Sequence, residues 1–356
     1  MEITFLLGNG LDLNCGCKSS YRDIYEYYLT QPSPNEWVKR LKNTISKNIE
    51  TWGDFEMAMA QYVASCKSSE EAIACIRDFK KQMDKYLVEE DERIGRIVFE
   101  SHVCLQEIEK SLKRFFWNNF PNEKRKVENL FQGSPLLYHF VSFNYTSFLD
   151  SLIIRAAKDI AEKSNKVRFN IPLSATISVN HIHGTLRGNE LLGVDNIEQI
   201  GSLAYDSKSL ERVFVKPTLN SYIDPDRVED AMKAIDNADI ICVFGMSLGD
   251  SDYSWRKRLI EWLEADSNHH LFLYVYSRSC AKTELNDEKL ENEEEAKEEF
   301  IGKAGINNPE IKRQIHIPIG SSIFNIKEKL EEEARQQIES EDRMSELLKS
   351  KQAEKI

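Results

Sequence analysis

Short apolar segments alternate with longer helical patterns along this chain, and this alternation constrains the fold more than any other feature. Helical patterns at Ser147 to Lys163, Asp226 to Asn237 and Tyr253 to Ala265 lie between the apolar segments. Such alternation is typical of a doubly wound parallel sheet. We therefore expect an α/β, Rossmann-like core with helices on both faces. The expected buried strands are Ile3 to Leu7, Leu137 to Phe143, Ser178 to Ile182, Val213 to Val215, Ile240 to Phe244, Leu271 to Tyr276 and Ile315 to Ile317.

A long segment without a strand pattern separates the first two expected strands. It is rich in charged residues and carries apolar positions at helical spacing, as in Ala58 to Val63 and Ile94 to Phe116. A helical insertion of this size is placed to cap a site or to form subunit contacts. The expected organisation is a Rossmann-like core from residues 1–32 and 134–320, a large helical insertion from 33–133 and a charged C-terminal helix from 321–356.

Charge and composition narrow the classes of partner. The formal net charge of -12 over 356 residues is unfavourable for broad attraction to nucleic acid, which is not expected as a partner. No apolar run approaches the roughly 20 residues that span a bilayer, so we expect a soluble, cytoplasmic protein without a membrane partner. The cysteines are odd in number and form no Cys-x-x-Cys pair, which predicts reduced thiols and no metal site.

The first expected strand ends in two closely spaced glycines. Gly8-Asn9-Gly10 follows it directly, and a glycine turn at the start of a helix lets backbone amides approach a phosphate. The turn lacks the third glycine of the dinucleotide fingerprint. By itself it leaves a ligand site and a purely structural turn equally open.

Four polar motifs follow four of the expected strands. Ligands of open α/β sheets bind outside the carboxyl ends of the strands, so we expect these motifs to converge on one crevice. The motifs are Gly8-Asn9-Gly10-Leu11-Asp12, Ser142-Phe143-Asn144-Tyr145-Thr146, His181-Ile182-His183-Gly184 and Gly245-Met246-Ser247-Leu248-Gly249-Asp250.

This set of motifs, in this order, resembles the sirtuin-like fold, whose glycine-rich first turn, Asn-containing strand end, His-Gly pair and Gly-x-Ser turn surround NAD. More closely, the chain is similar over about residues 1–255 to the AbiH family of bacterial phage abortive-infection proteins. The similarity to the AbiH family implies an anti-phage effector, and the resemblance to the sirtuin-like fold implies that it uses NAD. The motifs that carry it are Gly8-Asn-Gly-Leu-Asp12, Ser19-Ser20-Tyr21, Trp52-Gly-Asp-Phe-Glu56, Phe143-Asn-Tyr-Thr146, His181-Ile-His-Gly184 and Ser247-Leu-Gly-Asp-Ser-Asp252.

Two departures from the sirtuin-like pattern bear on the chemistry. In that pattern an Asp commonly follows the Asn by two positions and a Gln precedes it, whereas this chain has Thr146 and Phe143, so the ribose contacts are expected to differ. The zinc-binding cysteine pairs of the protein deacetylases are missing from the sequence, which disfavours deacetylation. The reduced set of Asn and His resembles the defence branch of the fold. This implies hydrolysis of the nicotinamide–ribose bond, with NAD as the substrate and no metal.

Asn144 and His183 are the expected catalytic residues. Cleavage of this bond needs an oriented water and a stabilised ribose cation. The Asn144 amide offers both a donor and an acceptor, and His183 can hold a ribose hydroxyl or take a proton from water. The alternatives are an Asn that caps the next helix and a structural histidine. His181 and His183 point to the same face of the strand, so one of the two could position the other.

The remaining expected contacts bind the nucleotide. Asp12 could bind a ribose hydroxyl or a water, or could stabilise a helix dipole. Ser247 and Asp250 could contact the phosphates or the adenine ribose, or cap the helix near Tyr253. Lys216 could neutralise a phosphate or be solvated. The expected cofactor-binding residues are Gly8, Asn9, Gly10, Asp12, Gly245, Ser247 and Asp250, and Trp52 and Phe55 are expected to pack the insertion.

Three functions remain open. The leading one is an NAD glycohydrolase that depletes the cofactor during phage infection. A second is a sensor that binds NAD, ADP-ribose or a related nucleotide without turnover. The third is a metal-dependent nuclease through Asp12, Asp250 and Asp252, although no compact carboxylate motif supports it. Because unrestrained loss of NAD would be toxic to the host, we expect a phage-derived trigger and a homo-oligomer that buries the site.

Overall fold

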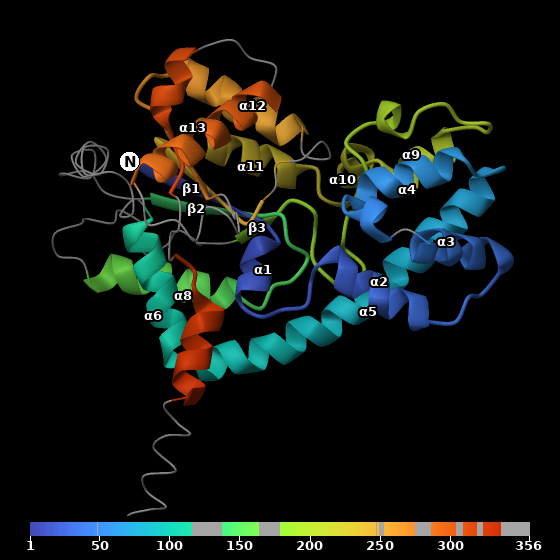
Figure 1. Ribbon diagram of the computed structural model, residues 1–356, viewed down its shortest axis with the longest axis horizontal. Coiled ribbons are helices and arrows are strands. Elements are labelled where there is room, and N and C mark those ends of the chain that lie inside the picture. The colour runs from blue at the N-terminus through green and yellow to red at the C-terminus, as the bar shows by residue number, and fades with distance from the viewer. Residues whose placement is uncertain are drawn as a thin grey trace, which may run out of the picture.

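A six-stranded parallel sheet forms the centre of the computed structural model (Figure 1). The structure describes residues 1–47, 49–115, 137–163, 179–246, 248, 253–274, 286–303, 309–318 and 323–335. The strand order is β3-β2-β1-β4-β5-β6, which is the order of the Rossmann fold. The strand order reverses between β1 and β4, and this position is the switch point of the sheet. The expected α/β class is confirmed. The strands are β1 (Glu2–Leu7), β2 (Leu137–Ser142), β3 (Val179–His181), β4 (Ile240–Phe244), β5 (His270–Tyr274) and β6 (Ile315–His316).

The strand register aligns the carboxyl ends of the central strands. Leu7 of β1 pairs with Ser142 of β2 and with Phe244 of β4, and Ser142 pairs with His181 of β3. The residues that follow these strands therefore emerge side by side at one edge of the sheet. This register brings together the polar motifs that the sequence places after separate strands.

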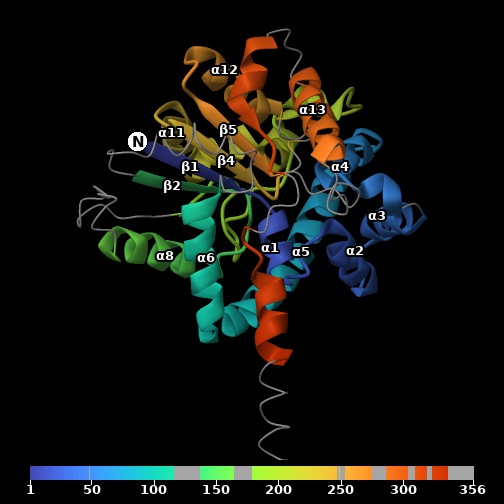
Figure 2. The ribbon, with the colours of Figure 1, turned by 60° about the vertical axis from the view of Figure 1, so that its left-hand side comes forward.

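Helices cover both faces of the sheet, as Figure 1 and the turned view in Figure 2 show. Alternate residues of β1 face opposite ways: Phe5 packs in one hydrophobic cluster and Leu6 in another. The first cluster includes α1 (Gly10–Asn14), α6 (His102–Arg114) and α8 (Asp150–Lys163). The second includes α11 (Asp226–Asp236), α12 (Tyr253–Ala265), α13 (Asn286–Lys303) and the 3-10 helix η5 (Pro309–Gln314).

A helical lobe lies beside the sheet and has a hydrophobic cluster of its own (Figure 1). Trp52 and Phe55 are buried in this cluster, where Phe55 stacks on Phe79 with ring centroids 4.0 Å apart. The described part of the expected insertion is therefore helical, and the exact domain boundaries stay a prediction. The lobe contains α2 (Tyr21–Thr30), α3 (Glu36–Lys47), η1 (Ile49–Trp52), α4 (Phe55–Ala64), the first part of α5 (Ser69–Glu100), η2 (Ile197–Ile200), α9 (Lys208–Phe214) and α10 (Lys216–Ile223).

Helix α5 connects the lobe to the sheet. Its Phe79 and Met83 are buried in the cluster of the lobe. Its Ile94 and Val98 are buried in the cluster beneath β1, which is the one that includes α1, α6 and α8. A helix of this length extends over about 48 Å. One rigid element therefore contributes to both hydrophobic cores.

One expected strand is absent. The residues from Val213 to Val215 belong to the end of α9 and to an isolated bridge between Val215 and Val194. Leu210 and Phe214 are both fully buried, and their spacing of four residues matches one face of a helix. This helical spacing outweighs the β-branched character of a three-residue run.

The described part of the C-terminal segment packs against the sheet. Phe324 and Ile326 are buried in the cluster beneath β1, and residues 326–335 are helical. The rest of the expected C-terminal helix lies outside the described residues. None of the helices in the described ranges is both long enough and apolar enough to cross a membrane.

Candidate functional site

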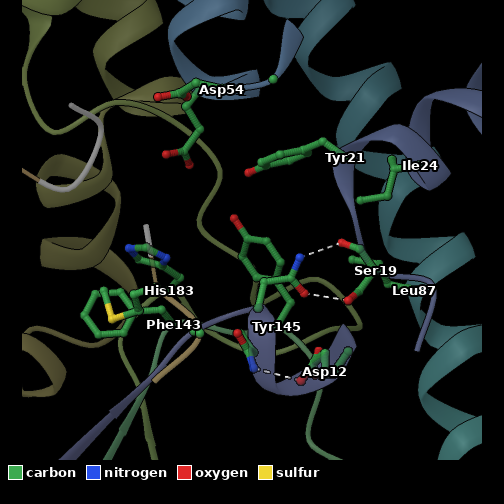
Figure 3. A pocket seen from close by; sticks show the side chains of 17 residues that line it. Asp12, Ser19, Tyr21, Ile24, Asp54, Leu87, Phe143, Tyr145 and His183 are labelled. Atoms are coloured by element: carbon green, nitrogen blue, oxygen red, sulfur yellow. Dashed lines mark hydrogen bonds between the residues drawn. The ribbon is translucent and has the colours of Figure 1, made fainter. Parts of the chain in front are cut away.

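A cavity of about 220 Å³ lies where the carboxyl ends of the strands face the helical lobe (Figure 3). Gly8 and Asn9 follow β1 and Gly245 and Met246 follow β4, so the cavity sits at the switch point of the sheet. This is where open α/β sheets bind their ligands. The residues that line it are Gly8, Asn9, Asp12, Ser19, Tyr21, Ile24, Gly53, Asp54, Glu56, Leu87, Phe143, Asn144, Tyr145, Thr146, His183, Gly245 and Met246.

The glycine turn after β1 packs against the turn after β4. The Gly8 amide donates to Phe244 O at 2.8 Å and the Gly10 amide donates to Gly245 O at 2.8 Å. A Cβ on Gly10 would lie 2.5 Å from Gly245 Cα, and Gly245 has a φ of 73°. These glycines are required for the close approach of two backbones. The Gly8 and Gly10 amides are occupied by carbonyls and are not offered to a phosphate.

Asp12 forms the centre of a buried hydrogen-bond network. Asn144 Nδ2 donates to Asp12 Oδ1 at 2.8 Å, and the Thr146 hydroxyl donates to Asp12 Oδ2. All three side chains are buried. Thr146, which departs from the sirtuin-like pattern, therefore binds a carboxylate that a different strand end supplies.

The Asn144 amide leaves one atom unpaired. Its Oδ1 is buried and has no hydrogen-bond partner among the described residues, and Asn144 lines the cavity. The amide orientation follows from Asp12, since a carboxylate requires the NH₂ group to face it. Asn144 does not cap a helix, because the next helix, α8, begins at Asp150. An unpaired buried acceptor is costly without a ligand, and it points to an absent hydrogen-bond donor.

Burial raises the pKa of Asp12 from 3.8 to about 7. The negative charge of Asp91 acts in the same direction, whereas the hydrogen bonds from Thr146 and Asn144 and the charge of His181 lower the pKa. A carboxyl group with such a pKa is partly protonated at neutral pH. Perturbed carboxyl groups of this kind are concentrated at functional sites.

His181 supports the backbone of Asn144 from outside the cavity. One ring nitrogen lies 2.8 Å from Asn144 O and the other lies 2.9 Å from Asp150 Oδ2. Burial lowers the pKa of His181, but the hydrogen bond and the charge of Asp150 outweigh it, and the pKa is raised. Both nitrogens face acceptors, which favours the doubly protonated ring. His181 therefore holds Asn144 in place rather than His183.

His183 lies on the cavity wall next to aromatic rings. Its ring meets Phe143 edge to face, with centroids 5.5 Å apart. Burial, with the positive charges of Lys216 and Arg227, holds the pKa of His183 well below 6.5. The imidazole is therefore neutral at physiological pH and can accept a proton.

The lobe contributes a second group of polar residues. Glu56 is buried and accepts from Lys216 Nζ at 2.7 Å and from the Gly193 amide at 3.1 Å. Asp54 caps α4 by accepting from the Met57 amide at 3.1 Å. Lys216 is thus neither solvated nor on the cavity surface.

Tyr21 and Asp54 stand on the lobe side of the cavity, across from Asp12 (Figure 3). Burial raises the pKa of Tyr21 well above 10, so its phenol is neutral. Sequence reasoning did not assign Tyr21, Asp54, Glu56 or Tyr145 to the site. Their signal was their position within the short motifs of the family pattern.

The expected site residues fall into three groups. Gly8, Asn9, Asp12, Asn144, His183 and Gly245 line the cavity together, and Gly10 lies directly behind its wall. Ser247 and Asp250 lie outside the described residues. Within the described ranges, no group of three His, Cys, Asp or Glu side chains could hold a metal ion.

The strand order and the polar cavity at the switch point define a Rossmann-like α/β protein with a strand-end site. Comparison of the sequence with protein families then identifies it further. The model of the family described as "Bacteriophage abortive infection AbiH" matches residues 4–274. The chain belongs to the AbiH family, and its role is anti-phage abortive infection. No curated protein matches the sequence.

Proposed function

We propose that the strand-end cavity binds NAD and that the protein hydrolyses the bond between nicotinamide and ribose. The observation that carries the proposal is the buried, unpaired Asn144 Oδ1, which lines a cavity at the switch point of a Rossmann-ordered sheet. The likeness of the motifs to the sirtuin-like fold, in which Asn and His surround NAD, supports the same ligand.

The chemistry assigns a role to each of two residues. Asn144 Oδ1 accepts a hydrogen bond from the attacking water and so fixes its position. The water oxygen bonds to the ribose carbon, the carbon–nitrogen bond breaks, and its electron pair neutralises the pyridinium nitrogen. The neutral His183 imidazole takes the proton that the water loses.

The size of the cavity sets which part of NAD it holds. A cavity of about 220 Å³ is smaller than the roughly 300–1,000 Å³ of pockets that enclose a drug-sized ligand. It fits one nucleoside half of a dinucleotide. We assign it to the nicotinamide ribose, because the reacting bond belongs next to Asn144 and His183.

The experiment incubates the purified full chain with NAD and follows nicotinamide release, with and without extract of phage-infected cells. Asn144→Ala is expected to lower the rate about 100- to 1,000-fold and His183→Ala about 100-fold or more. Asn180→Ala is the matched control, because the Asn180 amide donates to Arg227 O at 2.8 Å outside the cavity. The proposal fails if no condition releases nicotinamide while Asn144→Ala still abolishes defence.

A sensor of NAD or a related nucleotide is the second candidate. One observation favours it: Leu87 lines the cavity and belongs to α5, whose two parts are buried in different hydrophobic cores. A ligand that contacts Leu87 touches the element that joins lobe and sheet. Calorimetric binding of NAD without nicotinamide release would favour this function over hydrolysis.

A further inference from the structure

Most side-chain hydrogen-bond donors of the cavity are used within the protein itself. Asn144 Nδ2 and the Thr146 hydroxyl both donate to Asp12. The Asn9 amide donates to Ser19 O at 2.9 Å, and the Ser19 hydroxyl donates back to Asn9 Oδ1 at 2.5 Å. The Tyr145 hydroxyl donates to a backbone carbonyl at 3.1 Å. These donors are not directed at a ligand.

Acceptors dominate what the cavity offers to a ligand. Asn144 Oδ1 is unpaired, and Asp54 and Glu56 bring carboxylates to the lobe side. The charge of Glu56 is balanced by Lys216, whereas no lysine or arginine of the described chain pairs with Asp54. The described lining residues include no lysine or arginine, and because Asp12 is partly protonated, the uncompensated negative charge is that of Asp54. Such a surface favours a cation that carries its own donors.

The same wall is unsuited to a phosphate. The Gly8 and Gly10 amides, which would form an anion site in a glycine turn, donate to backbone carbonyls after β4. A phosphate inside the cavity would face Asp54 and the unpaired Asn144 Oδ1 without a cationic side chain among the described lining residues. Like charge and unmatched acceptors both oppose its entry.

We propose that the strand-end cavity selects a cationic nucleoside, in which a positively charged base and the ribose hydroxyls meet Asp54 and Asn144, and that it excludes phosphate. The choice of nicotinamide as the cationic base rests on the proposed function. The ligand then enters with its oxidised nicotinamide riboside half in the cavity. Its diphosphate lies outside, and the cavity binds the reduced, neutral nicotinamide riboside more weakly than the oxidised one.

The experiment compares oxidised nicotinamide riboside, which is cationic, with its reduced, neutral form. Ligand-observed NMR in the cold follows binding and nicotinamide release in the same sample. The oxidised riboside is expected to bind about 10-fold more tightly, and inorganic phosphate is expected not to displace it. Asp54→Asn should weaken binding of the oxidised form about 5- to 10-fold and leave the reduced form unchanged.

The Asp54→Asn variant retains the fold, because Asn caps a helix as well as Asp. Asp206→Asn, which removes an exposed carboxylate away from the cavity, is the matched control. Equal affinity for the two ribosides, displacement by phosphate, or binding of neither riboside overturns the charge selection. NAD hydrolysis with equal riboside affinities overturns this inference alone, whereas selective binding without hydrolysis overturns the proposed function alone.

Discussion

Asn144 Nδ2 lies 2.8 Å from Asp12 Oδ1, and this hydrogen bond turns the other end of the Asn144 amide, its unpaired Oδ1, into a free acceptor in the cavity wall. The two residues are separated by 132 positions in the chain. The turn after β1 thus orients the side chain that follows β2. Asp12, which was expected to bind ribose, instead fixes the side chain of Asn144, which is expected to perform the chemistry.

Replacing Asp12 by Asn is expected to stabilise the protein at alkaline pH. Burial raises the pKa of Asp12 from 3.8 to about 7, so between these values the folded chain binds a proton that the unfolded chain has released. Stability therefore falls as the pH rises through this window. At about 1.4 kcal/mol per pH unit, the full effect is about 4 kcal/mol. Thermal unfolding at pH 5 and pH 8 should show an advantage of the variant that grows with pH.

The Asp12→Asn variant is also expected to lose activity, because an amide at position 12 lets the Asn144 amide turn over and still form a hydrogen bond. We expect kcat for nicotinamide release to fall about 10-fold. Asp206→Asn, at an exposed site, serves as the control for both measurements. A variant with the same pH dependence of stability as the native chain would refute the account of Asp12.

Once the titration of Asp12 is removed by Asp12→Asn, the remaining activity is expected to persist below pH 6.5. Burial and the positive charge of Lys216 hold the pKa of His183 well below 6.5, so the imidazole stays neutral and able to accept a proton. In the Asp12→Asn variant, which lacks the carboxyl group that titrates near pH 7, the acid limb of the kcat/KM profile should therefore lie below pH 6.5. An acid limb at 6.5 or above would show that His183 is not the base in this environment.

The same histidine affects stability in a defined direction. The unfolded chain gains a proton on this histidine as the pH falls below about 6.5, whereas folded His183 stays neutral. Its contribution to stability is full above pH 6.5 and is lost as the pH falls. His183→Gln should reduce this acid sensitivity in thermal melts, and His102→Gln, at an exposed position, should leave it unchanged.

Breaking the buried pair between Lys216 and Glu56 is expected to be costly. Lys216→Met leaves the buried Glu56 carboxylate without the ammonium group that balances its charge, and the loss of stability should be about 3–5 kcal/mol. The double variant with Glu56→Gln should recover part of this loss. Thermal unfolding of the single and double variants measures the coupling.

Lys233→Met is the matched control for this pair, because Lys233 contacts Glu229 on the surface. It should cause no measurable change in the melting temperature. If Lys216→Met were equally silent, the pair would not stabilise the fold.

The sequence predicts the sheet well because its signal is local. The strand β4 is a continuous apolar run and β1 is mostly apolar, and the polar residues that follow them must meet at one sheet edge. Asn144 and His183 were placed together by this rule alone. The sequence predicts a strand from Val213 to Val215 because this short run is β-branched and aromatic. The buried pair that makes it helical, Leu210 and Phe214, extends beyond the run toward the N-terminus.

The lobe side of the cavity could not be predicted in the same way. Tyr21, Asp54 and Glu56 reach the site only because α2 and α4 pack in one cluster with residues 186–215. Lys216 and its partner Glu56 are 160 positions apart. No periodicity encodes such a contact. The role of Asp12 was ambiguous for the same reason, since its partners follow a different strand.

The amount of NAD in phage-infected cells tests the central claim most directly. Cells that carry the native chain should lose most of their NAD after infection and before lysis. Cells that carry Asn144→Ala should keep their NAD and lose defence, and cells with Asn180→Ala should behave as the native ones. Defence by the native chain while cellular NAD stays constant would contradict the account.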